Sequence, residues 1–143
     1  MSDEKVETVV AQQDFRVSVE RVYDAFLDAE TAAQFLFRTP GGEMVWKEID
    51  ARVGGSYALT ERRGGEDVLH TGEYLELERP GRIVFTFGVP KYSSAVSTVE
   101  LEIVPSGDGC AVTLTNLGVP VEWAEQTRVG WVGILAKAEM VVG

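Results

Sequence analysis

The chain has 143 residues, of which 45% are hydrophobic, and this size and content suit a single domain whose core needs no disulfide or metal. Its formal net charge of −10 repels phosphate, which argues against nucleic acid and anionic membranes as partners. The only cysteine, Cys110, excludes an internal disulfide, and without a secretory or membrane-length apolar run we expect a cytoplasmic protein.

The first third of the chain predicts one strand and two short helices. Residues 6–17 place several apolar side chains on one parity, which is typical of a half-buried strand. Ser18 can cap a helix over residues 18–28, and a second helical segment covers residues 30–37. The main apolar side chains of these segments are Val9, Ala11, Phe15, Val17, Val22, Ala25, Phe26, Ala29, Ala33, Phe35, Leu36 and Phe37.

From residue 44 onward, short apolar runs alternate with turn residues, the pattern of an antiparallel meander. Six strands are predicted, over residues 44–51, 55–62, 67–77, 82–89, 95–104 and 110–117. In residues 67–77 the alternation slips after Tyr74, which predicts a β-bulge there. Alternation elsewhere directs one set of side chains toward the core: Tyr57, Leu59, Ile83, Phe85, Phe87, Val99, Leu101, Ile103, Val112 and Leu114.

Residues 121–142 predict one long helix that closes the protein. Its expected buried stripe, flanked by Leu135, is Trp123, Thr127, Gly130, Trp131, Ile134, Ala138 and Val141. Each glycine inside a helix costs about 1 kcal/mol relative to alanine, so the glycines either leave room for a cavity or allow close backbone packing. A second apolar strip of Val129, Val132, Ala136 and Met140 either packs on the early helices or forms a dimer contact, so monomer and homodimer both remain open.

This order of elements predicts an α+β fold in which a curved, seven-stranded antiparallel sheet wraps the C-terminal helix. Several segments add a family resemblance: Val22-Tyr23-Asp24-Ala25-Phe26, Ala51-Arg52-Val53-Gly54-Gly55, Gly72-Glu73-Tyr74-Leu75-Glu76-Leu77, Arg79-Pro80, Ile83-Val84-Phe85-Thr86-Phe87 and Gly130-Trp131. Through them the chain resembles the START-like superfamily (SRPBCC, helix-grip fold). Within it, the chain is similar to the family of the C-terminal domain of the activator of heat-shock protein ninety ATPase.

The resemblance implies a helix-grip fold with an interior cavity. Proteins of the superfamily that it implies bind lipids, sterols, polyketides and plant hormones, and some are cyclases or oxygenase components. It also implies a heat-shock chaperone as a possible partner. The chain departs from its relatives at Asn116, where they often carry histidine in the strand before the last helix, so any role of that imidazole is absent.

Catalytic motifs are sparse. A glycine-rich phosphate loop, HExxH, paired cysteines and Gly-x-Ser-x-Gly are all missing, so we expect no cofactor and no metal site. His70 is a weak candidate acid or base, and the favoured interpretation is a neutral, hydrogen-bonded histidine. Glu48 shares parity with Met44 and Trp46, so its carboxylate would enter an apolar chamber if that face pointed inward, although a solvated carboxylate is the favoured interpretation.

Aromatic residues carry the stronger signal, because they either line a chamber for a flat or lipid-like molecule or fill the core. A pocket of roughly 300 Å³ or more would favour the chamber. Three functions follow as hypotheses: binding of a small hydrophobic or aromatic ligand, a co-chaperone interaction, and a cyclase- or hydrolase-type enzyme using His70 with Tyr74 or Glu48. The expected ligand-binding residues are Phe35, Phe37, Trp46, Tyr57, His70, Tyr74, Phe85, Trp123, Thr127, Gly130 and Trp131.

Overall fold

A computed structural model describes residues 5–37, 41–92 and 94–142. In chain order the elements are β1 (Val6–Phe15), α1 (Val19–Leu27), α2 (Ala29–Ala32), β2 (Glu43–Ile49), β3 (Ser56–Arg63), β4 (Glu66–Glu78), β5 (Arg82–Phe87), β6 (Ser97–Ser106), β7 (Gly109–Pro120), the 3-10 helix η1 (Val121–Trp123) and α3 (Ala124–Val142). The predicted order is confirmed. The second helix is shorter than predicted, because α2 ends at Ala32 and residues 33–37 form a turn.

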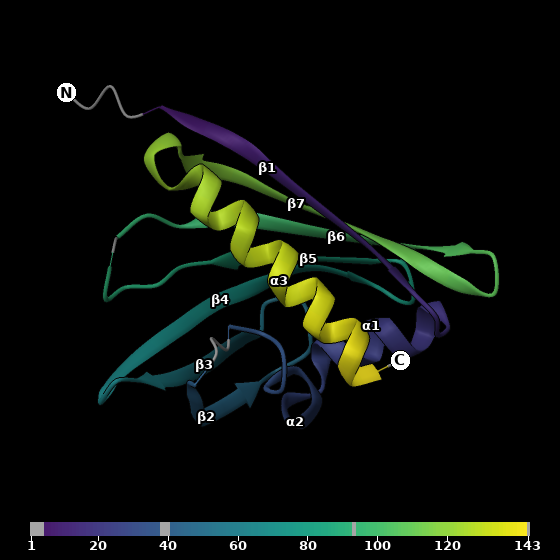
Figure 1. The fold of residues 1–143 in the computed structure, drawn as a ribbon, viewed down its shortest axis with the longest axis horizontal. Helices are drawn as coiled ribbons and strands as arrows, with labels where there is room; N and C mark the ends of the chain where they lie inside the picture. The colour runs from purple at the N-terminus through teal and green to yellow at the C-terminus, as the bar shows by residue number, and fades with distance from the viewer. Residues whose placement is uncertain (1–4, 38–40, 93, 143) are drawn as a thin grey trace.

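The seven strands form one antiparallel sheet in the order β1-β7-β6-β5-β4-β3-β2. Neighbouring strands in the sheet are also neighbours in sequence, except for β1, which pairs with β7. Helix α3 crosses the curved sheet closest to β1, and α1 and α2 lie near its C-terminal end (Figure 1). The predicted α+β helix-grip fold is therefore confirmed.

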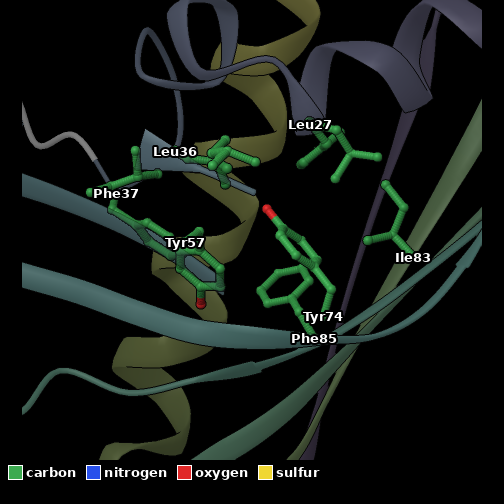
Figure 2. A pocket seen from close by; sticks show the side chains of 10 residues that line it. Leu27, Leu36, Phe37, Tyr57, Tyr74, Ile83 and Phe85 are labelled. Atoms are coloured by element: carbon green, nitrogen blue, oxygen red, sulfur yellow. The ribbon is translucent and has the colours of Figure 1, made fainter. Parts of the chain in front are cut away.

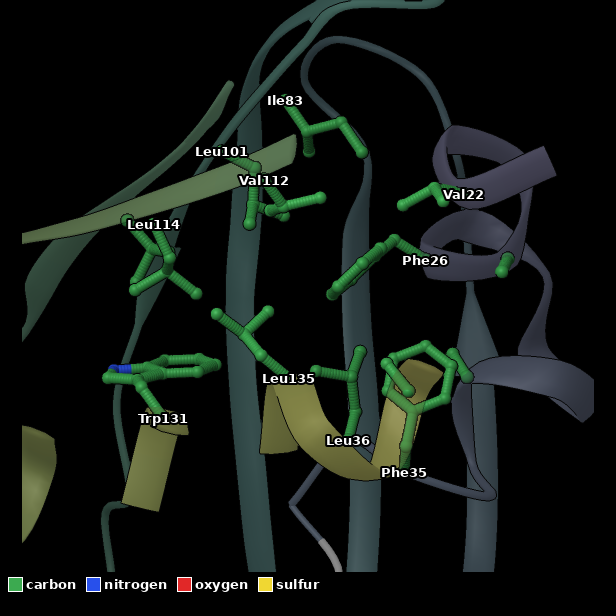
Figure 3. Packing of buried hydrophobic residues seen from close by; sticks show 14 of the residues in the cluster. Val22, Phe26, Phe35, Leu36, Ile83, Leu101, Val112, Leu114, Trp131 and Leu135 are labelled. Atoms are coloured by element: carbon green, nitrogen blue, oxygen red, sulfur yellow. The ribbon is translucent and has the colours of Figure 1, made fainter. Parts of the chain in front are cut away.

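The core lies between the sheet and α3, as the alternation predicted. Figure 3 shows Trp131 and Leu135 of α3 beside Leu114 of the sheet, with side chains of α1 in the same cluster. The predicted inward residues of β3 and β5 to β7 all belong to this core, with Phe87 only partly buried. The predicted bulge is also present, since the pairing of β4 with β5 shifts register between Tyr74 and Glu76.

The predicted inward position of Trp46 is wrong. A bulge between Met44 and Trp46 shifts the register of β2 against β3, so Met44 packs on the core whereas Trp46 is 58% exposed. Trp46 pairs with Thr60, a residue of opposite parity to the buried Leu59. Glu48 follows Trp46 to the outer face and is exposed, so it does not enter an apolar chamber.

The buried face of α3 also differs from the prediction. Its buried residues are Ala124, Trp131, Leu135, Ala138 and Val142. Trp123 is 44% exposed because it ends η1, a tighter helix whose turn does not continue the α-helical phase. Gly130 lies about 100° around the helix from Trp131 and is exposed.

The two helical glycines therefore serve neither predicted purpose. A Cβ atom built on Gly130 or Gly133 would meet no atom within 4 Å, so they neither border the interior nor allow close backbone packing. The second apolar strip, Val129, Val132, Ala136 and Met140, is exposed, so of its two expected roles the packing on the early helices does not occur.

Two side chains fix the C-terminal end of α3. Nε of Arg21 in α1 donates to the carbonyl oxygen of Val142 at 2.9 Å. Arg16, just after β1, forms an ion pair with Glu139 at 3.3 Å. Ser18 caps α1 as predicted, because its side chain accepts a hydrogen bond from the backbone N–H of Arg21. The end of α3 is thus held at a fixed place on the sheet.

Candidate ligand-binding site

Aromatic rings fill the interior between sheet and helix. The Phe37 ring stacks on His70 and Phe87, with centroid distances of 4.7 and 5.0 Å. Trp131 of α3 meets both phenylalanine rings edge-on at 5.7 Å. The remaining void has a volume of about 10 Å³, which is room for about one water molecule.

Two tyrosines supply the polar side-chain atoms around this void. Its lining is Phe26, Leu27, Leu36, Phe37, Ile49, Tyr57, Leu59, Tyr74, Ile83 and Phe85. The Tyr57 hydroxyl donates to the carbonyl oxygen of Thr86 at 2.8 Å. Figure 2 shows the Tyr74 hydroxyl pointing away from the sheet, between Leu27 and Leu36.

A larger pocket opens at the other end of the helix, where the β5–β6 connection lies beside η1 and the start of α3 (Figure 1). Its volume is about 160 Å³. The lining is Phe87, Gly88, Val89, Tyr92, Ala95, Ser97, Asn116, Val119, Pro120, Trp123 and Thr127. We call it the open pocket; its walls are aromatic and aliphatic, with a few neutral polar groups.

Asn116 holds one wall of the open pocket in place. Its side-chain amide donates to the Ser97 hydroxyl at 2.9 Å and to the Thr98 carbonyl oxygen at 3.1 Å. Its side-chain oxygen accepts a hydrogen bond from Trp131 Nε1 at 2.9 Å. One buried amide therefore joins β6, β7 and α3, and it positions the Trp131 ring, which packs edge-on against Phe87 of the open-pocket lining.

Replacing Asn116 by alanine is expected to lower the free energy of unfolding by about 2 kcal/mol, because the buried Trp131 N–H loses its acceptor. Urea denaturation measures the change. Thr115→Ala, on the other face of the same strand, is the matched control and should cost less than about 1 kcal/mol. Equal losses in the two variants would contradict this role for Asn116.

His70 belongs to a buried polar cluster with Glu61 and Arg63. Arg63 pairs with the fully buried Glu61, and its Nη2 lies 3.3 Å from His70 Nε2. Because arginine only donates, Nε2 accepts, and the ring proton is on Nδ1, 3.3 Å from the carbonyl oxygen of Leu59. Burial, assisted by the charge of Arg63, lowers the pKa of His70 to about 4.

This geometry agrees with the neutral, hydrogen-bonded interpretation of His70. The ring lies against Phe37 and lines neither the small void nor the open pocket. The sequence analysis missed Glu61. Glu61 shares the parity of the buried residues Tyr57 and Leu59, which is the one sequence signal that it points inward. A buried carboxylate is unusual without a cationic partner, and the partner, Arg63, is identified only in the folded chain.

The predicted ligand-binding residues separate into four groups. Phe37, Tyr57, Tyr74 and Phe85 meet around the small void, and Trp123 and Thr127 line the open pocket. Trp131, His70 and Phe35 are buried in the core, and Phe35 packs edge-on against Phe26 at 5.1 Å. Trp46 and Gly130 lie on the outer surface. Residues of the open pocket outside the predicted set are Phe87, Gly88, Val89, Tyr92, Ala95, Ser97, Asn116, Val119 and Pro120.

Clustered metal ligands and membrane-spanning helices are both absent from residues 5–37, 41–92 and 94–142. In these ranges no three His, Cys, Asp or Glu side chains gather closely enough to hold a metal ion. No helix of the described chain has the length and apolar character needed to cross a membrane.

The curved antiparallel sheet around one long helix, with cavities between them, defines a helix-grip α+β protein. The chain belongs to the family described as activator of Hsp90 ATPase homolog 1-like protein, whose sequence profile matches residues 16–142. No curated protein matches the chain.

Solved structures of similar proteins cover nearly the whole chain. Protein CV1439 from Chromobacterium violaceum is 27% identical with a TM-score of 0.86, over 94% of this chain and 96% of that one. Protein Mll3558 from Rhizobium loti is 25% identical with a TM-score of 0.81, over 97% and 99% of the two chains. An AHSA1-like protein from Aeromonas hydrophila is 20% identical with a TM-score of 0.80, over 95% and 92%.

Proposed function

We propose that this chain is a single-domain binding protein that takes a small, uncharged, apolar or aromatic ligand in the open pocket. The observation that carries the proposal is a cavity of about 160 Å³ bordered by Phe87, Trp123 and Pro120, with hydroxyl groups on Ser97, Thr127 and Tyr92. Rings supply contact area, and a few neutral polar groups fix orientation, as is usual in small-molecule sites.

The volume limits the size of the ligand. It is below the roughly 300 Å³ that would favour a drug-sized or lipid-like molecule. An apolar cavity of about 150 Å³ is known to hold benzene, so one aromatic ring is the appropriate size for the space of about 160 Å³ observed here.

The surrounding charge favours a neutral ligand. The lining contains no Asp, Glu, Lys or Arg, and the nearby Glu122 and Glu125 follow the pocket residue Pro120 along the chain. Lys91 and Arg128, the cations next to lining residues in sequence, are paired with Glu66 and Glu125. A ligand carboxylate would therefore be desolvated without a cationic partner, at a cost that a neutral ring avoids.

The three tryptophan indole N–H groups provide the test, because each lies in a different environment: Trp123 at the pocket, Trp131 in the core and Trp46 on the outer face. Titration with p-cresol, followed by two-dimensional NMR, is expected to shift the Trp123 signal with a Kd on the order of 0.1 mM and to leave Trp46 unmoved. Benzoate should bind at least about tenfold more weakly.

Matched variants locate the binding. Trp123→Ala is expected to weaken p-cresol binding by about tenfold or more, since it removes a wall of the pocket. Trp46→Ala removes an equally large side chain from the outer face and should leave the Kd unchanged. No saturable shift with p-cresol, or equal effects of the two variants, would overturn the proposal.

A co-chaperone interaction is the second candidate function, and the family to which the chain belongs is the observation that favours it. The exposed strip of Val129, Val132 and Met140 on α3 is an apolar surface on which a partner protein can pack. An unchanged ATPase rate of a purified heat-shock chaperone in the presence of this protein would remove this candidate. The cytoplasmic location stays a prediction under either function.

A further inference from the structure

The outer face of α3 is exposed and largely apolar. Its outward positions recur at alternating steps of three and four residues, and we call them the outer row: Gln126, Val129, Gly133, Ala136 and Met140. All five residues are exposed. Figure 1 shows α3 on the near side of the sheet, so the outer row lies at the surface of the molecule. Rows with this spacing are the seams along which two helices pack.

The two glycines of α3 have no explanation within one copy of the chain. Each costs the helix about 1 kcal/mol relative to alanine. A Cβ atom at Gly130 or Gly133 would nevertheless meet no atom of the described chain within 4 Å. Helices approach one another most closely where their side chains are smallest. Gly133, in the middle of the outer row, is therefore the place where a second helix can come nearest to α3.

The outer row is complementary to itself. Gly133 is the midpoint of α3, so two antiparallel copies that cross there overlap along the whole helix, roughly 28 Å. Gly133 then meets its own counterpart. Val129 lies beside the partner's Ala136, and Met140 lies beside the partner's Gln126. The bulky side chain of Val129 thus faces a small one, an arrangement that fills a helix interface without overlap.

The charge of α3 favours a second copy of this chain as the occupant. The helix is neutral overall, because it contains two acidic and two basic residues: Glu125, Glu139, Arg128 and Lys137. The whole net charge of −10 therefore lies outside α3. Two equally charged copies repel one another least where each is locally neutral. A basic partner would instead be attracted to the outer face of the sheet, where three glutamates surround Arg82.

We propose that the outer row of α3 is a homodimer contact, in which two copies of the chain pack their C-terminal helices antiparallel about a two-fold axis at Gly133. Such an interface uses the same surface on both copies, as is usual in two-fold dimers. The inference goes beyond the proposed function and is independent of it, because no residue of the outer row lines the open pocket.

The size of the contact sets the expected strength of the dimer. A strip as long as α3 and about 10 Å wide offers roughly 300 Å² on each copy, less than the roughly 800 Å² of a standard interface. We therefore expect a weak, reversible dimer with a Kd on the order of 0.1 mM.

Sedimentation equilibrium of the full-length protein, from about 10 μM to about 1 mM, tests the proposal and is expected to show a change from monomer to dimer. Val129→Glu should weaken the dimer by about tenfold or more, because each copy brings a carboxylate into the contact. Val104→Glu is the matched control and should leave the Kd unchanged. Val104 is 52% exposed, against 56% for Val129, but it lies on the outer face of β6. It adds the same charge to each copy, so it also controls for general repulsion.

Cysteine cross-linking tests the antiparallel geometry. Gly133→Cys places two thiols at the two-fold axis and is expected to form an intermolecular disulfide under mild oxidation. Gln126 is also exposed, but in antiparallel helices it lies about 20 Å from its counterpart, so Gln126→Cys should cross-link about tenfold more slowly or not at all. The native Cys110 is buried and does not compete.

Urea denaturation establishes that each variant is folded before association is compared. If Val129→Glu does not fold, Met140→Glu replaces it, since Met140 is 75% exposed and belongs to the same row. Three results would overturn the inference: a full-length protein that is monomeric at the highest concentration, equal effects of the two glutamate variants, or equal cross-linking rates of the two cysteine variants. A heat-shock chaperone that binds the outer row of a monomeric protein would also overturn it, and would assign this surface to the second candidate function.

Discussion

Gly72→Ala is expected to lower the free energy of unfolding by about 3 kcal/mol or more. A Cβ atom at this position would overlap the backbone carbonyl group of Thr86 and would come within 2.9 Å of Cε1 of Tyr57. The contact cannot relax easily, because the same carbonyl oxygen accepts the Tyr57 hydroxyl at 2.8 Å and the adjacent Thr71 bridges to Gly88. Urea denaturation measures the loss, and a variant that does not fold agrees with it.

Gly130→Ala is the matched control. This glycine lies inside α3, is exposed, and would place its Cβ more than 4 Å from any neighbour. Alanine there should raise the free energy of unfolding by about 0.5 to 1 kcal/mol, because a helical glycine has high conformational entropy in the unfolded chain. Similar effects of the two substitutions would show that the close approach of β4 to β5 at Gly72 is not the cause.

Acidification from pH 6.5 to pH 4 is expected to remove about 3 kcal/mol of stability through His70 alone. Burial and the Arg63 charge hold the pKa of His70 at about 4 in the folded protein, against 6.5 for an exposed histidine. Above pH 6.5 both states are neutral and the residue has no effect. As the pH falls through this window, the unfolded chain takes up a proton that the folded protein does not, so the unfolded state is favoured.

The measurement is the free energy of unfolding of the wild type and of His70→Gln between pH 4 and 7.5. His70 is the only histidine in the chain, so the difference between the two curves isolates its titration. Glutamine does not titrate, so the wild type should lose about 3 kcal/mol relative to the variant on acidification. Parallel curves would contradict the low pKa. Glu61 and Arg63 face the imidazole and are unchanged in the comparison.

The sequence predicted the fold because its strands alternate cleanly. Val99, Leu101 and Ile103 follow one parity without interruption, so β6 could be oriented from the pattern alone. The pattern failed where a bulge was hidden. Nothing in the composition of residues 44–48 marks the register shift before Trp46, because apolar side chains stand on both parities of this segment.

The candidate site was less predictable than the fold. Trp123 and Thr127 were predicted to contact a ligand, and both line the open pocket. The other walls of this pocket come mainly from the β5–β6 connection and the end of β7. Loop residues such as Tyr92 carry no periodic signal, so only the folded chain shows where they lie.

The pairing of β1 with β7 has a consequence for biosynthesis. Phe15 is opposite Cys110 and Val9 is opposite Asn116, so β1 finds its partner only after about a hundred further residues have been synthesised. Until then the nascent chain exposes one edge of β6 as well as the apolar face of β1. Late closure by β7 therefore makes this a slow-folding topology.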